Sequence, residues 1–279
     1  MHMERVRAWI ENCDKLHQDF LPLHKILMSP VFDGEHHTVL QQISAACLRS
    51  TGSVLVLLEN DRHWDAELVL RSVQEGTIKF EYILSERSQL GHRLHEFAED
   101  HFEITSLKIH DRATELINIF TKINRKASPA LSALLLNKDE YNALKSRFPR
   151  KLRQQIEGEW GFTRLIDRLA SSKTPVAELF PALLHGYGMA SHLQHVDAVG
   201  IGVVAERESR SEPSKSSTKL AQIARIIADC NAYSLMRLMS AYMCAGEDAK
   251  HVYDVWERYR KSFDDLLGAQ REWEQADFS

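Results

Sequence analysis

DRHWDAELVLRSVQEGTIKFEYIL, residues 61–84, is the stretch that decides the fold, because its apolar residues repeat with the period of an α-helix. At about 100° per residue, they fall on two opposite stripes of such a helix. The first stripe holds Trp64, Leu68, Ile78 and Tyr82, and the second holds Val69, Val73, Phe80 and Leu84. Two apolar faces predict a helix that packs between neighbouring helices.

The rest of the chain shows the same helical periodicity on both sides of this segment. Further helices are predicted at about residues 4–28, 36–59, 86–122, 159–171, 175–196, 218–245 and 248–276. Only 12 Gly and 7 Pro interrupt 279 residues, which is few for an all-β protein of this length. The sequence therefore predicts an all-α, multi-helix bundle that ends in two long helices.

One segment reads as a linker between two parts of the bundle. Residues 200–217 have low apolar content and many charges in their second half, which favours a mobile loop. We expect a helical core domain at residues 1–199, a flexible linker at 200–217, and a C-terminal helical pair at 218–279 packed on the core.

The charge and the cysteine content of the chain indicate its cellular location and its classes of binding partner. The net charge of −4 gives no global reason to expect nucleic-acid or membrane binding. The four cysteines form no CxxC pair, so free core thiols in a reducing compartment are expected. Residues 1–10 do not have the composition of a signal peptide, and the apolar run at 54–58 is too short to span a membrane. These features predict a cytoplasmic protein.

Charged residues on the first apolar stripe mark one candidate site. Arg71 and Glu75 lie among the apolar residues of that stripe and, four positions apart, face each other on the helix. An unpaired buried charge costs several kcal/mol, so this pair must be hydrogen-bonded or lie at the wall of a cleft.

A second apolar stripe, on the predicted helix 175–196, becomes polar toward its C-terminal end. Tyr187, Ser191 and His195 follow one another at intervals of four residues. If the two stripes face each other, Arg71, Glu75, Ser191 and His195 form a catalytic set, and Arg71, Glu75 and Tyr187 bind a ligand. Alternatively, Arg71 and Glu75 form a structural ion pair, and Ser191 and His195 hydrogen-bond the backbone.

These residues carry a family resemblance. Leu70-Arg71-Ser72-Val73-Gln74-Glu75, with Tyr187, Ser191 and His195, resembles short motifs of the bacterial domain of unknown function 5677 over roughly residues 40 to 200. That family is helical and looks like a distant relative of the HEPN domains, many of which are metal-independent ribonucleases in toxin–antitoxin and phage-defence systems. The resemblance implies a HEPN-like core, a ribonuclease activity and a homodimer.

HEPN ribonucleases also carry an arginine followed after four to six residues by a histidine. In that family the arginine is thought to bind the scissile phosphate and the histidine to move a proton. Arg87 and His92 fit the spacing and are secondary catalytic candidates. Such a loose spacing arises by chance in a chain with 14 histidines, and Gly91 weakens the helix at this point.

Other patterns point to partners and metals. Arg147, Arg150, Lys151 and Arg153, with Lys145, form a basic cluster that predicts contact with RNA phosphates or, alternatively, a solvated helix start. His92-x-x-His95 and His192-x-x-His195 each bring two imidazoles near one helix face, but neither carries the further ligands of a metal site. We expect surface or hydrogen-bonded histidines, and neither a metal nor a cofactor.

Three functions remain open from the sequence. The first is a HEPN-like, RNA-directed ribonuclease or toxin/defence effector, which if enzymatic needs no metal. The second is a non-catalytic helical domain that binds or regulates a protein partner. The third is a small-ligand-binding bundle that uses Arg71, Glu75, Tyr187, Ser191 and His195.

Overall fold

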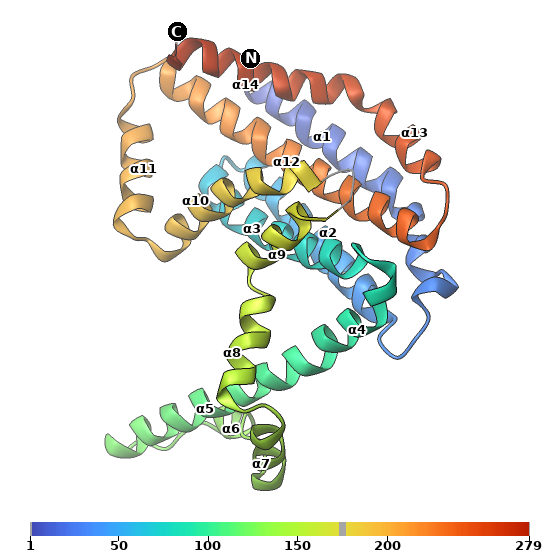
Figure 1. The fold of residues 1–279 in the computed structure, drawn as a ribbon. Helices are drawn as coiled ribbons and strands as arrows, with labels where there is room; N and C mark the ends of the chain where they lie inside the picture. The colour runs from blue at the N-terminus through green and yellow to red at the C-terminus, as the bar shows by residue number, and fades with distance from the viewer. Residues whose placement is uncertain (1, 173–176, 279) are drawn as a thin grey trace. The chain divides into compact units, whose positions relative to one another are not determined.

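Helices account for 85% of the chain in the computed structural model, which describes residues 2–172 and 177–278. These described residues contain no strand, so the prediction of an all-α fold is confirmed. The chain divides into a larger unit, Met1–Arg87 with Leu165–Ser279, and a smaller unit, Ser88–Arg164 (Figure 1). Residues 200–279 all lie within the larger unit, and the expected arrangement of core domain, linker and C-terminal pair stays a prediction.

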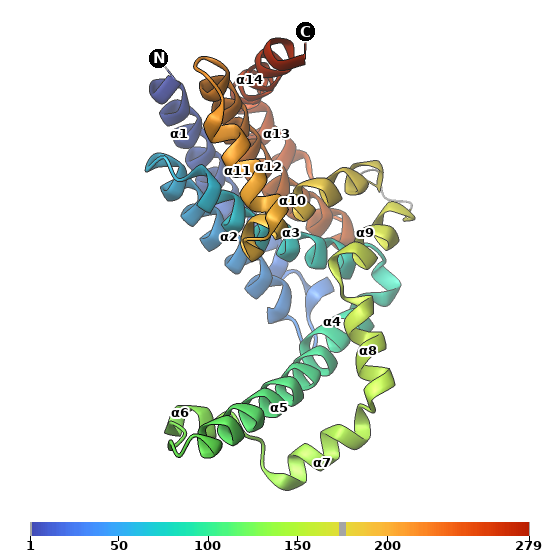
Figure 2. The same cartoon turned by 90° about the vertical axis from the view of Figure 1, so that its left-hand side faces the viewer.

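The larger unit is built on a helical hairpin and three long helices. α2 and α3 pack along each other, α12 lies on α3 and α1, and α14 lies on α12 (Figure 2). Its helices are α1(His2–Phe20), η1(Leu21–Met28), η2(Pro30–Phe32), α2(Thr38–Glu59), α3(His63–Leu84), η5(Ala177–Ala182), α10(Leu183–His195), α11(Ala198–Ser209), α12(Ser214–Ala245), α13(Lys250–Arg258) and α14(Arg260–Phe278). η3(Arg87–Gln89) begins with the last residue of the larger unit and continues into the smaller one. α9(Phe162–Ala170) begins in the smaller unit and ends in the larger one.

The core of the larger unit lies where α1, α2, α3, α12 and α14 meet. Trp9, Val54, Val73 and Ile227 are all buried in one apolar cluster there. Both stripes predicted on residues 61–84 contribute buried side chains, such as Ile78 from the first stripe and Val73 from the second. α3 is therefore packed on two sides, as its sequence predicts.

The segment predicted as a flexible linker is mostly helical. α11 ends at Ser209 and α12 begins at Ser214, so only four residues of 200–217 lie between the two helices. The Asp197 side chain caps α11, because its Oδ1 accepts hydrogen bonds from the backbone N–H groups of Val199 and Gly200, each at 3.0 Å. A Cβ on Gly200 would lie 2.4 Å from the carbonyl oxygen of His192, so the close approach of α11 to α10 requires glycine at this position.

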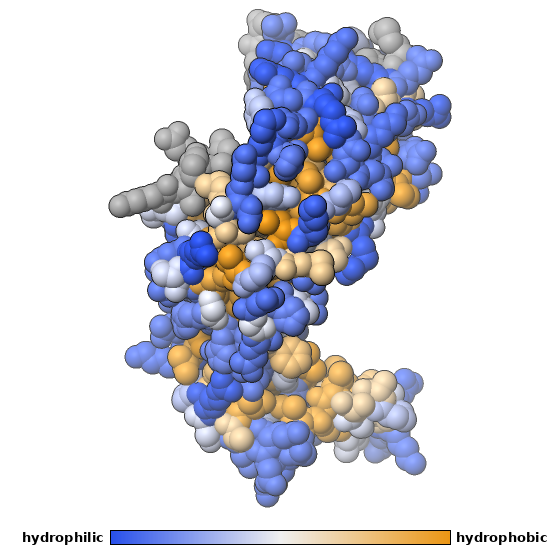
Figure 3. All heavy atoms as spheres, turned by 90° about the vertical axis from the view of Figure 1, so that its right-hand side faces the viewer, coloured by the Kyte–Doolittle hydropathy of each residue, from blue (hydrophilic) through white to orange (hydrophobic). Residues whose placement is uncertain are grey.

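The smaller unit is organised around α5. Its helices are α4(Leu90–His95), the π-helical turn η4(Glu96–Asp100), α5(His101–Lys122), α6(Pro129–Ser132), α7(Lys138–Arg147) and α8(Arg150–Glu159). α6, α7 and α8 all contact α5, and the α7 start is fixed by a capping box between Asn137 and Glu140. Apolar side chains are also exposed on this unit (Figure 3). They include Phe102, Ile109 and Leu116 on α5, and Ile123 directly after it.

Within residues 2–172 and 177–278, none of the helices is long and apolar enough to cross a membrane.

Candidate functional site: a polar-floored pocket in the larger unit

Three of the five residues predicted to share a site lie together between α3 and α10. The Arg71 Nη2 donates a hydrogen bond of 2.7 Å to the Tyr187 hydroxyl, and that hydroxyl donates one of 2.8 Å to Glu75 Oε1. The Arg71 Nε lies 3.4 Å from the same Glu75 oxygen, and its Nη1 donates to Gln194 Oε1 at 2.5 Å. Burial raises the pKa of Tyr187, with the Glu75 hydrogen bond raising it further and Arg71 opposing the rise.

The other two predicted residues are placed differently. His195 is exposed at the end of α10, and Ser191 is partly buried. Within the described part of the chain, neither forms a hydrogen bond with Arg71 or Glu75. Arg71, Glu75 and Tyr187 contact one another, an arrangement that fits the structural alternative in which they tie α3 to α10. A catalytic role for Arg71, Glu75, Ser191 and His195 stays a prediction.

The secondary candidates do not form a described site. Arg87 is exposed in η3, at the end of the larger unit, and His92 is exposed on α4 in the smaller unit. His192, predicted as a hydrogen-bonded histidine, lies 2.6 Å from Asp197 through its Nδ1 and a carboxylate oxygen. His95 lies 3.7 Å from Glu99 in the same way.

The basic cluster of the smaller unit is partly neutralised by carboxylates of the same unit. The Arg147 guanidinium lies 2.8 Å from Asp100 and 2.7 Å from Glu103. Arg153 lies 3.9 Å from Asp111, whereas Arg150 and Lys151 are exposed. These acidic neighbours reduce the local positive charge, and RNA binding by the cluster stays a prediction.

Beside the Arg71–Tyr187–Glu75 contact, the larger unit contains a pocket of about 480 Å³ between α3, α10, α11, α12 and α14. Apolar and aromatic side chains make much of its wall, including Trp64, Leu70, Met189, Leu193 and Trp273. The pocket therefore combines the size and the lining that are typical of small-molecule sites.

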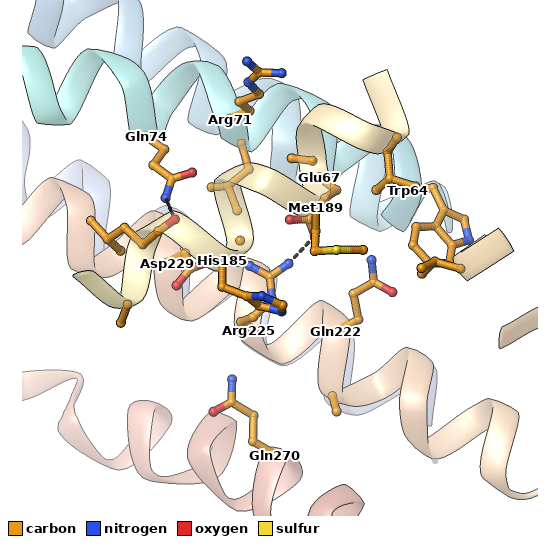
Figure 4. Close-up of a pocket in the computed structure, with 18 of the residues that line it drawn as sticks. Trp64, Glu67, Arg71, Gln74, His185, Met189, Gln222, Arg225, Asp229 and Gln270 are labelled. Carbon is orange, nitrogen blue, oxygen red and sulfur yellow. Dashed lines mark hydrogen bonds and ion pairs between the residues drawn. The ribbon is translucent and has the colours of Figure 1, made fainter. Parts of the chain in front are cut away.

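An ion-paired triad makes part of the pocket wall. Arg225 on α12 contacts the Glu67 carboxylate on α3 and lies 2.7 Å from Asp229 on its own helix (Figure 4). Burial raises the pKa of Asp229 to about 6, and the neighbouring Arg225 opposes that rise. The two carboxylates together hold the pKa of Arg225 above its ordinary value despite burial.

Neutral polar groups complete the lining. Gln74 donates a hydrogen bond of 3.0 Å to the Leu183 carbonyl, which fixes α10 against α3. His185 and Met189 project from α10 toward the α12 side chains of Gln222 and Arg225, and Gln270 comes from α14 (Figure 4). The Arg71 guanidinium is directed away from Arg225 in the same view, toward its partners on α10.

Sequence reasoning missed the triad, although the signal was present. Arg225 and Asp229 are four residues apart in an otherwise apolar stretch of α12, which is the pattern that drew attention to Arg71 and Glu75. Arg207 on α11, another pocket residue, lies in the charged segment read as a linker.

Fold and pocket together define an all-α protein with a polar-floored cavity inside its larger unit. The chain belongs to the family of unknown function DUF5677, whose sequence profile matches residues 37–212, more than half of its length. The match includes α2, α3 and α10, and so confirms the resemblance seen in the motifs. Neither a curated protein nor a solved structure matches the chain.

Proposed function

We propose that this protein is a small-molecule-binding helical bundle and that its ligand occupies the pocket of the larger unit. The observation that carries the proposal is the cavity of about 480 Å³, in which apolar and aromatic walls surround a few polar groups. Cavities of roughly 300–1,000 Å³ with such linings commonly bind drug-sized molecules. The proposal corresponds to the third function that the sequence left open, moved from the Arg71–Glu75 pair to the adjacent cavity.

The polar part of the pocket is held in place before any ligand arrives. Glu67 is buried and engaged by Arg225, and Gln74 is buried and engaged by a backbone carbonyl. Side chains fixed in this way lose little conformational freedom when they contact a ligand, which favours binding. The Arg71–Tyr187–Glu75 contact holds α10, one wall of the pocket, against α3.

The cellular location and the other two functions depend on other features of the chain. Four free, buried cysteines support the predicted cytoplasmic location, because thiols persist in reducing compartments. Ribonuclease activity of a bacterial toxin or defence effector, homodimer formation and protein-partner binding stay predictions. The pocket is the observation that favours small-molecule binding, and it is therefore the basis of our proposal.

The experiment uses N-phenyl-1-naphthylamine, a neutral dye that fluoresces when it enters an apolar site. Gly186 lines the pocket on α10 and has no atom within 4 Å of the position of a Cβ, so Gly186→Phe fills the pocket without a backbone clash. Gly188 has equally open surroundings on the same helix but does not line the pocket, which makes Gly188→Phe the matched control.

We expect the wild-type protein and Gly188→Phe to bind the dye equally, and Gly186→Phe to bind it at least about tenfold more weakly, as expected when added volume excludes a ligand. Equal affinity of the two variants would contradict the proposal, because the dye would then be bound elsewhere. Circular dichroism of both variants checks that the helices remain formed.

A further inference from the structure

The arginine side chains that line the pocket indicate which class of ligand it binds. Three arginines, Arg71, Arg225 and Arg207, line the cavity. Arg71 is paired with Glu75, and Arg225 is paired with Glu67 and Asp229. Arg207 forms no ion pair with a carboxylate in the part of the chain that the structure describes, and its Nη1 donates a hydrogen bond of 2.8 Å to the neutral amide oxygen of Gln222.

The surroundings of Arg207 make an unpaired charge unfavourable. Its Cζ lies 5.3 Å from the centre of the Trp64 ring, so one face of the guanidinium is covered. Burial lowers the pKa of Arg207, the positive charges of Arg210 and Arg225 lower it further, and Glu67 and Glu206 oppose these effects. A guanidinium nonetheless remains charged in proteins. Because no carboxylate of the described residues forms an ion pair with Arg207, this charge lacks a direct counter-ion.

We infer that the ligand of the pocket carries an anionic group that binds Arg207, and an apolar or aromatic body that lies against the tryptophan side of the cavity; this inference rests on the proposed function. A carboxylate, phosphate or sulfonate supplies the missing counter-charge and matches the fork of N–H donors on the guanidinium. Trp64 and Trp273 both line the cavity and offer flat apolar surface to the body of such a molecule.

A cationic ligand fits the cavity less well. Three carboxylates line the cavity: Glu67 and Asp229 already share Arg225 between them, and Glu274 is exposed to solvent on α14. A cation bound to Glu67 and Asp229 would have to compete with the Arg225 guanidinium, whereas an anion at Arg207 displaces only a hydrogen bond to a neutral amide. The charge pattern of the pocket thus favours an anion.

The test compares two dyes of the same aromatic type, the anionic 8-anilinonaphthalene-1-sulfonate and the neutral N-phenyl-1-naphthylamine. Both are titrated into the wild-type protein, Arg207→Gln, Arg207→Lys and Arg210→Gln. Arg210 does not line the pocket and is paired with Glu206, so its replacement removes an equal charge close by without removing the proposed contact. The quantity measured is the ratio of the two dissociation constants in each variant.

We expect Arg207→Gln to weaken the anionic dye relative to the neutral one by about tenfold, as expected when a charge-assisted hydrogen bond is lost. Arg207→Lys should restore part of the ratio, and Arg210→Gln should leave it within about twofold, since Arg210 is paired with Glu206 and does not line the cavity. An unchanged ratio in Arg207→Gln, or an equal change in Arg210→Gln, would overturn the inference while the pocket itself stands.

Two further outcomes are informative. If Gly186→Phe changes the dissociation constant of neither dye, the pocket is not a binding site, and the proposed function fails together with the inference. If inorganic phosphate displaces the anionic dye at concentrations similar to that of the dye, the site takes a bare anion, and the inferred apolar body is wrong.

Discussion

Arg71 on α3 donates a hydrogen bond of 2.7 Å to the hydroxyl of Tyr187 on α10, 116 residues further along the chain. The same hydroxyl donates to Glu75, so one oxygen joins both members of the α3 ion pair to α10. Because α10 is a wall of the pocket, this contact connects the stability of the fold to the shape of the candidate site.

Replacement of Tyr187 by phenylalanine tests this contact. The ring stays, but Arg71 and Glu75 each lose a partner, so we expect a loss of about 1 kcal/mol in the free energy of unfolding, measured by urea denaturation. Tyr253→Phe is the control, because Tyr253 is 53% exposed and its replacement should change the free energy by less than about 0.5 kcal/mol. Equal losses in the two variants would show that the Tyr187 hydroxyl does not stabilise the fold.

Arg225 and Arg207 should differ sharply in their effect on stability. Arg225→Met leaves the Glu67 and Asp229 carboxylates together without their shared cation, which should lower the free energy of unfolding by about 3 kcal/mol at pH 7. Arg207→Gln removes a charge that has no direct counter-ion, so we expect a change of less than about 0.5 kcal/mol. A similar loss in both variants would mean that the ion pairs around Arg225 contribute nothing specific.

The Arg225→Met variant should also regain stability in acid. Even beside Arg225, burial raises the pKa of Asp229 in the folded state to about 6 from its ordinary 3.8. A carboxyl whose pKa is raised by folding favours the folded state at low pH, and this contribution is lost as the pH rises through that value. Because Arg225 lowers the pKa of Asp229, its removal raises this pKa further, and the variant gains more stability in acid than wild type does. The stability deficit of the variant relative to wild type should therefore shrink between pH 7 and pH 5, and a constant deficit would contradict this explanation.

The corner between α10 and α11 depends on one glycine. A Cβ at Gly200 would lie 2.4 Å from the His192 carbonyl oxygen, so Gly200→Ala should move α11 and with it Arg207. We expect a loss of about 1–3 kcal/mol in unfolding free energy and weaker binding of the anionic dye. Gly202 lies on the same helix with no atom within 4 Å of a Cβ, so Gly202→Ala should be neutral or stabilising through helix propensity. Stabilisation by both alanines would contradict the described corner.

Glu81 gives a prediction about alkaline pH. It is buried and accepts a hydrogen bond of 2.5 Å from the Ser240 hydroxyl; burial raises its pKa from 4.5 to about 8, while Ser240 and Arg237 oppose the rise. The stability from the neutral carboxyl is present below about pH 4.5 and is lost as the pH rises to about 8.

The Glu81→Gln variant cannot ionise at this position, so its melting temperature should fall less than that of wild type between pH 5 and pH 9. Glu35→Gln, at an exposed position, serves as the control and should follow the wild-type curve. Parallel curves for Glu81→Gln and wild type would mean that Glu81 does not remain protonated in the folded protein.

The sequence predicts the helices of the central hairpin well. Helices expected at 36–59 and 61–84 are observed at 38–59 and 63–84, because their apolar residues alone specify both faces. The charged segment 200–217 was expected to be a loop, and its composition gives no helical signal. Its helix α11 is stabilised instead by the Asp197 cap and by packing against α10 and α12.

Only part of the candidate site could be predicted from the sequence. The meeting of Arg71, Glu75 and Tyr187 follows from residues spaced on two helical stripes. Arg207 could not be found in this way, because only the return of α11 onto α12 brings it to Gln222 and Trp64. Periodicity describes one helix at a time, whereas a pocket depends on which helices meet.

The most direct test of the pocket and its ligand class is a crystal structure of the protein with 8-anilinonaphthalene-1-sulfonate. We predict the dye inside the cavity, with its sulfonate within hydrogen-bond distance of the Arg207 guanidinium and its rings beside Trp64. An empty cavity, with the dye bound instead on the exposed apolar side chains of α5, such as Phe102 and Leu116, would contradict the account.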